Sequence, residues 1–200
     1  MSALGRRLSL ASGAAFAAAA VLPPLSTFGA QLFAVHMAQH LLLIAAAAPL
    51  LALGARLSPP PVAAWLLFVA TFLFWHWPAA FQWAAQNPAT DLLELASILA
   101  TAFAFWSAAF ARDRLSHGAR ALLVMVAAVA TDLPGVIMLF APRAICVMPG
   151  ENAPAFGITP LEDQQIAGLL MWVPANLVFF AIATVLFARW ISPHQDLVTS

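Results

Sequence analysis

About six long apolar runs, separated by short polar or proline-rich segments, make up most of the chain. They cover roughly residues 8–24, 31–53, 62–80, 91–110, 119–141 and 163–188. Each approaches the ~20 residues that an α-helix needs to cross the hydrocarbon core of a bilayer. The segments between them, such as "GARLSPPP" and "RDRLSHG", carry the proline, glycine and charged residues that end helices. The pattern predicts an all-α, polytopic membrane protein, a helical bundle of about six transmembrane helices.

The composition is that of a chain that lies mostly in lipid. Hydrophobic residues make up 64% of the 200 residues, charged residues make up 8%, and the mean hydropathy is +0.92. A soluble domain carries roughly 25% charged residues, so this chain has too few polar groups to cover its own surface. Its tryptophans lie mostly near the ends of the apolar runs, as expected of an aromatic belt at the membrane interface.

Several classes of function are excluded by what the sequence lacks. The net charge is zero and there is no basic patch, so nucleic acid is not expected as a partner. The single cysteine, Cys146, rules out an internal disulfide and a CxxC site. We find no plausible pair of nucleophile and base and no nucleotide-binding loop, and therefore do not expect an enzyme.

The arginines predict how the bundle is oriented. In a six-span topology one side holds Arg6, Arg7, Arg56, Arg112, Arg114, Arg120 and Arg189, and Arg143 alone lies on the other side. The positive-inside rule makes the arginine-rich side cytoplasmic, with both termini inside and the long loop 142–162 outside. Residues 1–24 form an N-terminal transmembrane helix or a signal-like segment, and we favour the helix. Residues 25–190 then form a membrane bundle of five spans, followed by a short cytoplasmic tail, 191–200.

Two histidines lie inside the second apolar run, in "AVHMAQHLLL". His36 and His40 are four residues apart, so they share one helix face and can bind the same metal ion. At the rise of an α-helix, His36 lies roughly 7 Å and His40 about 13 Å below the outer face. Each imidazole needs a partner in lipid, and the alternative to a metal is a hydrogen bond between helices.

Further polar side chains fall in the same outer layer of the bundle. His76, in "FWHWPAAF", lies roughly 9 Å and Asp132 about 12 Å below the outer face, and Glu94 lies near the outer end of its run. Met171 lies two turns below the start of the last run. Polar groups within a membrane usually face the bundle interior and mark function. We predict a metal site with the ligands His36, His40 and His76, and with Asp132, Glu94 and Met171 as second choices.

Most of the polar residues beyond His36 and His40 also have a purely structural interpretation. His76 can bond to a backbone carbonyl that Pro78 leaves free, and Asp132 can bond to the kinked backbone of its own helix. Asp91 and Glu94 can cap the fourth helix, because the helix dipole favours acids near an N-terminus.

The remaining polar residues have similar alternatives. Thr159 or Asp163 can cap the last helix, with Pro160 at its first position, and Met171 can be an ordinary core residue. His117 and His194 fall in cytoplasmic segments, where we expect them to be solvated.

The donor set favours copper over other metals. Imidazole combined with thioether or thiolate suits Cu(I), and Met138, Cys146 and Met148 add soft donors near the outer surface. Zinc remains an option through histidine and carboxylate ligands. No CxxCH is present, so covalent haem is not expected. A non-covalent haem held by His76 together with His36 or His40 is an open alternative.

The pattern as a whole resembles a known family. The stretches "HMAQHLLLIAAAAPLLALG", "FWHWPAAFQWA", "FAPR" and "GITPLEDQQIAGLLMWVP" are similar to the CtaG family of polytopic membrane cytochrome c oxidase assembly factors. The similarity covers roughly residues 30–190. The family's HxxxH matches His36 and His40, its Trp-His matches Trp75 and His76, and its Asp-Gln matches Asp163 and Gln164.

The resemblance implies a bacterial inner-membrane protein that assists the maturation of a haem–copper oxidase. It would bind copper transiently at the periplasmic side and help its insertion into an oxidase subunit. Its partners would be oxidase subunits, the lipid bilayer and periplasmic copper chaperones. Asp163 and Gln164 would support the site by hydrogen bonds from outside the ligand set. Family histidines in the fourth and fifth spans correspond here to Asp91, Leu95 and Ala130, so this site has more carboxylate and would bind Cu(I) less tightly.

Three other functions compete with copper handling. The first is a membrane redox protein that binds non-covalent haem. The second is a metal-free assembly scaffold whose histidines only bond between helices. The third, a copper permease, is disfavoured because the inner half of the predicted bundle offers no polar path.

Overall fold

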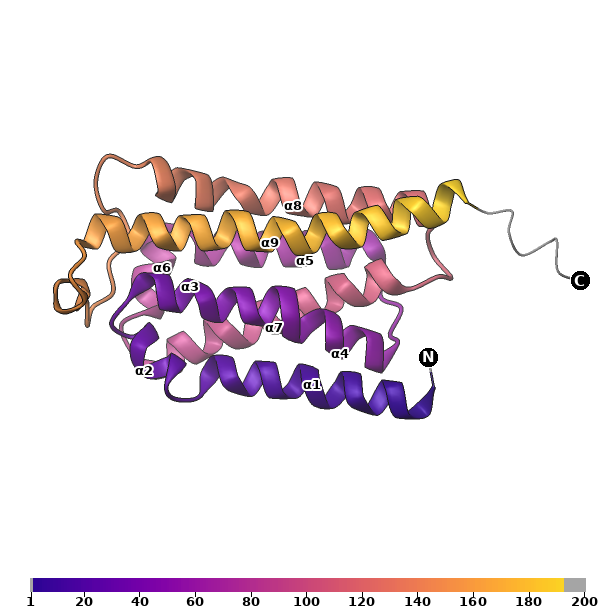
Figure 1. Cartoon of the computed structure of the whole chain (residues 1–200), viewed down its shortest axis with the longest axis horizontal. Coiled ribbons are helices and arrows are strands. Elements are labelled where there is room, and N and C mark those ends of the chain that lie inside the picture. The colour runs from indigo at the N-terminus through magenta and orange to yellow at the C-terminus, as the bar shows by residue number, and fades with distance from the viewer. Residues whose placement is uncertain (1, 193–200) are drawn as a thin grey trace, which may run out of the picture.

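The computed structural model describes residues 2–192, and this range is entirely helical apart from its turns and loops (Figure 1). Its elements are α1 (Ala3–Val21), α2 (Leu25–Gly29), α3 (Phe33–Leu41), the π-helix η1 (Leu42–Ala47), α4 (Ala48–Ala55), α5 (Pro61–Trp75), α6 (Pro78–Ala84), α7 (Pro88–Phe110), α8 (His117–Phe140), the 3-10 helix η2 (Ala153–Phe156) and α9 (Pro160–Ile191). His194 and most of the predicted tail 191–200 lie outside the described residues.

The structure confirms the prediction of an all-α, polytopic membrane bundle. Four stretches are long and apolar enough to cross a membrane: Phe33–Ala55, which joins α3, η1 and α4, and the helices α7, α8 and α9. Helices α5 and α6 add a fifth span if they are taken as one segment bent by 80°. Of the six predicted spans, the first is not among these candidates, although α1 is a helix of 19 residues.

Helix α1 packs closely along α4 and η1. A Cβ on Gly13 would lie 2.8 Å from Cγ of Leu51 and 3.0 Å from the carbonyl oxygen of Ala47, so only glycine allows this approach. Small residues at crossing points are typical of helices that associate within membranes. In the structure α1 is therefore part of the bundle, and whether residues 1–24 are retained stays a prediction.

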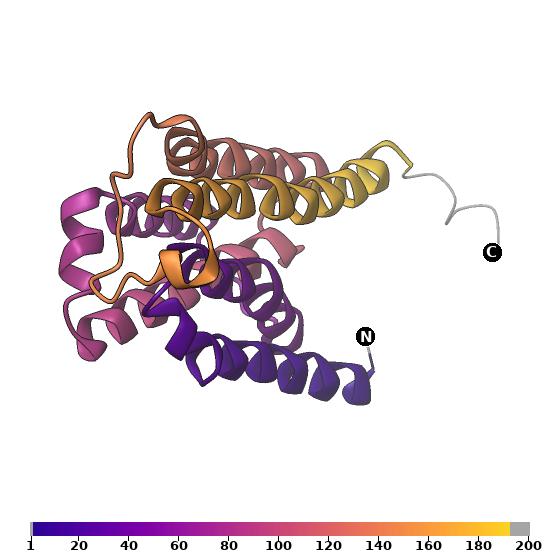
Figure 2. The same ribbon diagram turned by 60° about the vertical axis from the view of Figure 1, so that its left-hand side comes forward.

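One end of the bundle is covered by the long loop between α8 and α9, which Figure 2 shows crossing over the ends of the helices. The side-chain amide of Gln82 in α6 donates to the carbonyl of Val147 in this loop at 3.1 Å. The backbone N–H of Asn152 donates to the carbonyl of Gln31, just before α3, at 3.0 Å. The loop is thus fixed to elements on both sides of the bundle, at the end where α3, α7 and α9 begin.

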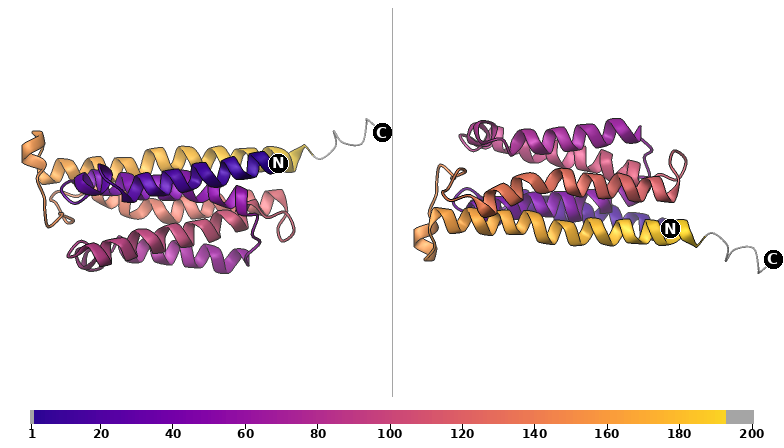
Figure 3. Two further views of the ribbon diagram at one scale, coloured as in Figure 1. Left: turned by 90° about the horizontal axis from the view of Figure 1, so that it is seen from below. Right: turned by 90° about the horizontal axis from the view of Figure 1, so that it is seen from above.

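Helices α8 and α9 form an antiparallel hairpin with direct backbone contact, while α5 and α7 lie side by side on the far side of the bundle (Figure 3). A Cβ on Gly168 of α9 would lie 2.6 Å from the carbonyl oxygen of Gly135 in α8. The side-chain amide of Asn176 also donates to the Asp132 carboxylate across this interface, at 2.8 Å.

A proline just after the π-helix η1 explains why the helix ends there. The backbone N–H of Ala48 bonds to the carbonyl of Leu43, so the next bond of this type would join residue 49 to Ile44. Residue 49 is a proline and has no N–H to donate. The indole Nε1–H of Trp106 in α7 donates to the Ile44 carbonyl instead, at 2.8 Å. Isolated π-turns are frequent near functional sites, and this one begins two residues after His40.

Candidate metal centre

Helix α3 carries the two predicted histidines, and its start is fixed by another helix. Leu32, which precedes α3, has no side chain that can cap it. The carboxylate of Asp163 in α9 accepts the backbone N–H groups of Phe33 and Ala34, at 2.7 and 2.9 Å. Asp163 was expected to cap its own helix as one option, but the structure shows that it caps α3. His36 lies on the first turn that this carboxylate holds.

His36, His40 and Glu94 form a compact buried cluster between α3 and α7. Oε1 of Glu94 lies 3.5 Å from Nε2 of His36 and 3.3 Å from Nε2 of His40. The two imidazole rings have centroids 4.7 Å apart. One ligand atom from each of the three residues lies within 4.8 Å of the others. None of the three is more than 2% exposed, so the cluster is sealed from solvent.

Five buried polar atoms of this cluster have no hydrogen-bond partner, although Glu94 lies within ion-pair distance of both imidazoles. They are Nε2 of His36, both ring nitrogens of His40 and both carboxylate oxygens of Glu94. Buried polar groups in proteins are almost always hydrogen-bonded, and the contacts of Glu94 with the two imidazoles do not supply such bonds. A cation bound among these atoms would satisfy them together. The side chains present therefore fit a metal ion.

His76 lies next to the cluster, at the C-cap of α5 where the chain bends into α6. Its Nδ1 lies 2.6 Å from the carbonyl oxygen of Phe72, so Nδ1 carries the proton and Nε2 keeps its lone pair. Nε2 is buried without a partner, and the His76 ring centroid lies 5.3 Å from that of His40. Metal-binding histidines usually donate their other N–H in this way. A backbone carbonyl was expected as the partner of His76, and the structure shows one. It is the carbonyl of Phe72, and not that of Phe74, which Pro78 would leave free and which accepts the Trp77 N–H instead.

The acids of α7 are not its hydrogen-bonding caps. Asn87 caps the helix, and its side-chain oxygen accepts the N–H groups of Ala89 and Thr90, both at 3.0 Å. Asp91 lies in the first turn, with Oδ1 3.6 Å from Nδ1 of His36. Asn87, and not Asp91 or Glu94, thus supplies the hydrogen-bonding cap, although Asp91 lies in the first turn, where the helix dipole favours an acid. Both carboxylates face the histidines of α3.

A surface cavity lies close to the cluster, next to Asp91. This cavity of about 470 Å³ is lined by Asp91, Gln39 and Met148 among others. Asp91 is partly exposed, whereas Met148, a residue of the covering loop, is buried. The Asp91 side chain thus lines the cavity and also lies beside His36 of the buried cluster.

Two further candidates of the sequence, Met171 and Asp132, lie in different surroundings. Met171 lines a small cavity of about 20 Å³ together with His40, which is room for roughly one water molecule or ion. Asp132 bonds to Asn176 of α9, and not to the backbone of its own helix as one interpretation held. Within residues 2–192, the compact group of possible ligands does not include Asp132.

The start of α9 and the neighbouring Gln164 hold the covering loop in place. Thr159 and Glu162 form a capping box, and Pro160 is the first helical residue, as expected. The side-chain oxygen of Gln164 accepts the N–H groups of Ile145 and Cys146, at 2.6 and 3.0 Å. Its amide nitrogen donates to the Met138 carbonyl at 3.0 Å. Asp163 and Gln164 thus bond to backbone around the cluster, and neither bonds to one of the three clustered side chains.

The soft donors near the loop differ in what they can offer a metal. Met138, Cys146 and Met148 are all buried. Burial raises the pKa of the Cys146 thiol to about 11, so the thiol stays protonated at neutral pH. Because the thiolate is the form that binds metals, Cys146 is a poor donor in this setting.

Sequence reasoning missed two features that shape the centre. Gln39, between the two histidines, donates from its side-chain amide to the Ala20 carbonyl at the end of α1. The indole of Trp75 donates to Ser97 of α7 at 2.8 Å, next to the bend at His76. A glutamine inside an apolar run was itself a detectable signal, whereas the Trp75 contact depends on how two helices pair.

Comparison with known proteins identifies the family. The model of the cytochrome c oxidase caa3 assembly factor family, Caa3_CtaG, matches residues 2–60 and 55–192. Comparisons with curated proteins and with solved structures return no match. The family match confirms the resemblance seen in the sequence, and it extends through α1 to the end of α9. The chain belongs to the cytochrome c oxidase caa3 assembly factor family.

Proposed function

We propose that this protein is a non-enzymatic assembly factor that holds copper transiently and helps its insertion into a subunit of a haem–copper oxidase. The observation that carries the proposal is the cluster of His36, His40 and Glu94, whose buried ligand atoms converge without hydrogen-bond partners. Membership in an oxidase assembly family supports the destination of the metal. Oxidase subunits are then the partners, and copper is a cargo that must leave again.

The surroundings of the cluster favour copper, and Cu(I) in particular. Imidazole ligands suit copper, zinc, iron and nickel, whereas a thioether selects Cu(I) among them. Met171 shares its small cavity with His40 and offers that thioether. A monovalent ion would also balance the charge of the buried Glu94 carboxylate. His36, His40 and Glu94 are the proposed ligands, with His76 and Met171 next to them, while the bond to Asn176 makes Asp132 the weakest candidate.

The cavity at Asp91 is the proposed route for the ion. The carboxylate of Asp91 lies 3.6 Å from Nδ1 of His36, and the same residue lines the surface cavity. Met148 in the same cavity gives a soft donor on the path. An ion would pass from a donor protein, such as a periplasmic copper chaperone, through this cavity to the cluster.

The proposed orientation places the metal centre towards the periplasm. Arg56, Arg112 and Arg189 lie at the end of the bundle opposite the covering loop, together with the first turn of α1 (Figure 1). Arginine-rich ends of membrane proteins usually face the cytoplasm. This gives a multi-pass inner-membrane protein with its N-terminal helix starting at the cytoplasmic side.

A haem at this site is disfavoured by the geometry. The His40 and His76 rings have centroids only 5.3 Å apart and meet edge to face at 74°. Cofactor pockets usually have roughly 300–1,000 Å³, whereas the cavity beside His40 has about 20 Å³. No space for a porphyrin separates these two histidines.

The test is the copper content of the oxidase made in the presence of variants. Cells that lack the native protein would produce wild type, the double variant His36→Ala/His40→Ala, or the control His117→Ala, in which the altered histidine lies at the far end of the bundle. We expect the double variant to lower the copper-to-haem ratio of the purified oxidase at least several-fold, with the control at the wild-type level. Normal copper in the double variant, with the protein present in the membrane, would favour a metal-free scaffold.

A further inference from the structure

A second group of polar residues lies at the end of the bundle opposite the metal centre. Arg112 follows α7, Arg120 lies in the first turn of α8 and Arg189 lies in the last turn of α9. All three border one cavity of about 620 Å³ between the α4 and α9 regions. The rest of its lining is apolar and includes Leu50 and Ile182. The cavity is thus lined by three arginines and by an apolar wall.

No carboxylate balances these arginines in the part of the chain that the structure describes. None of the ion pairs identified among the described residues involves Arg112, Arg120 or Arg189. The charges that act on Arg120 are those of Arg112 and Arg189, and both are positive. Like charges held together in this way repel one another, and an anion between them would relieve the repulsion.

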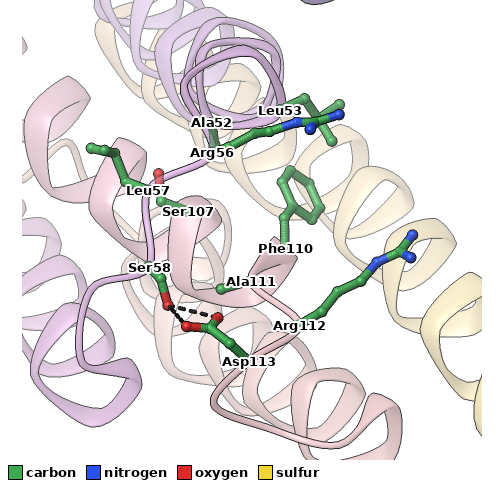
Figure 4. A pocket seen from close by; sticks show the side chains of 10 residues that line it. All are labelled: Ala52, Leu53, Arg56, Leu57, Ser58, Ser107, Phe110, Ala111, Arg112 and Asp113. Carbon is green, nitrogen blue, oxygen red and sulfur yellow. Dashed lines mark hydrogen bonds between the residues drawn. The ribbon is translucent and has the colours of Figure 1, made fainter. Parts of the chain in front are cut away.

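The nearest acid in sequence does not supply that anion. Asp113 follows Arg112 directly, but its carboxylate accepts a hydrogen bond from the Ser58 hydroxyl at 2.8 Å. Figure 4 shows the Arg112 side chain running the other way, towards the ribbon of α9. The guanidinium of Arg112 is therefore directed to the side of the bundle where Arg189 lies.

Arg120 is the unusual member of the group, because it is buried. Its side chain is only 3% exposed. Nη1 donates to the carbonyl of Phe110, the last residue of α7, at 3.3 Å, and Nε has no partner. Arginines at membrane interfaces normally extend towards water, and a buried guanidinium with an unused N–H is costly. An anion in the cavity that Arg120 lines would balance the charge of its guanidinium.

We propose that this cavity binds an anionic phospholipid. Its phosphate would lie at Arg112, Arg120 and Arg189, since the guanidinium fork matches the geometry of phosphate oxygens. Its acyl chains would lie along the apolar wall between α4 and α9. Basic pockets between transmembrane helices on the cytoplasmic side are known to bind anionic head groups. A free phosphate would use the rim alone and leave the apolar wall without a role.

The direct test measures lipid retained by the full-length protein. Delipidated protein in neutral detergent would be titrated with phosphatidylglycerol or phosphatidylcholine of the same acyl chains, and bound lipid would be counted by native mass spectrometry. The variants are Arg112→Gln/Arg189→Gln, which leaves buried Arg120 and the fold in place, and the triple variant that adds Arg120→Gln. The control is Arg143→Gln, an arginine in the loop at the other end.

We expect phosphatidylglycerol to be retained at least tenfold better than phosphatidylcholine. The preference should fall severalfold in the double variant and vanish in a folded triple variant, and it should persist in the control. Equal retention of both lipids, or an unchanged preference in the double variant, would overturn the proposal. Displacement of phosphatidylglycerol by inorganic phosphate at a similar affinity would also overturn it, because the site would then bind a free anion.

Discussion

Replacing Asp163 by alanine tests how α9 positions the histidines of α3. The carboxylate is 2% exposed and accepts two backbone N–H groups, from Phe33 and Ala34, at 2.7 and 2.9 Å. Leu32 offers no replacement, so the variant leaves both donors at the start of α3 without a side-chain cap. His36 lies within the turn that would fray.

The expected cost follows from these two bonds. A hydrogen bond to a charged group contributes about 1.5–3 kcal/mol, and losing a helix cap costs about 0.5–2 kcal/mol. The two effects overlap at one helix end, so we expect Asp163→Ala to lower the free energy of unfolding by about 2–4 kcal/mol. For a chain of this size that corresponds to a midpoint lower by roughly 4–16 °C. Asp163→Asn keeps one acceptor oxygen and should lose about half as much.

The assay is thermal unfolding in detergent, paired with metal retention by the same samples. The control is Glu162→Ala, which removes the adjacent exposed acid and affects only the capping box of α9. We expect the control to cost about 1 kcal/mol and to bind metal like wild type. If Asp163→Ala unfolds at the wild-type temperature and retains metal fully, the cap does not position His36 and this reasoning fails.

Three further predictions follow from contacts outside the cluster. Trp106→Phe leaves the Ile44 carbonyl without its indole donor and should cost about 1–3 kcal/mol in thermal unfolding, with Trp190→Phe as the exposed control. Gly168→Val forces α9 away from the Gly135 backbone and should cost about 1–3 kcal/mol or more, and an unchanged midpoint would contradict the close packing. Cys146, with its pKa raised to about 11, should alkylate very slowly at pH 7 in folded protein and about tenfold faster per pH unit up to that value; a rate that levels off near pH 9 would refute the shift.

The fold was largely predictable because apolar runs report directly on membrane spans. The prediction of spans failed or was incomplete at the first and third apolar runs. Helix α1 carries Arg6 and Arg7 and is not among the candidate spans, and the third run breaks at His76 into two helices bent by 80°. A proline after the histidine signalled that break, but its angle depends on how α6 packs on α7. The π-helix η1 was not predicted, because it needs both the proline at residue 49 and an indole donor from another helix.

The site was predictable where one helix carries the pattern and less so where helices meet. His36 and His40 share a face by their spacing alone, and they converge as expected. Glu94 was a second choice, since an acid near a helix start is usually a cap. Only the pairing of α3 with α7 brings its carboxylate within 3.5 Å of both imidazoles. Asp163 likewise was a candidate cap for its own helix, and the helix that it does cap lies 130 residues earlier.

The most direct test of the metal centre is the metal content of the purified protein. Wild type, His36→Ala/His40→Ala and the control His117→Ala would be loaded with Cu(I) under reducing conditions, desalted and analysed for copper, with absorption spectra recorded for haem. We predict close to one copper per chain in wild type and in the control, less than a tenth of that in the double variant, and no Soret band. A wild-type protein that retains no copper would contradict the proposed function.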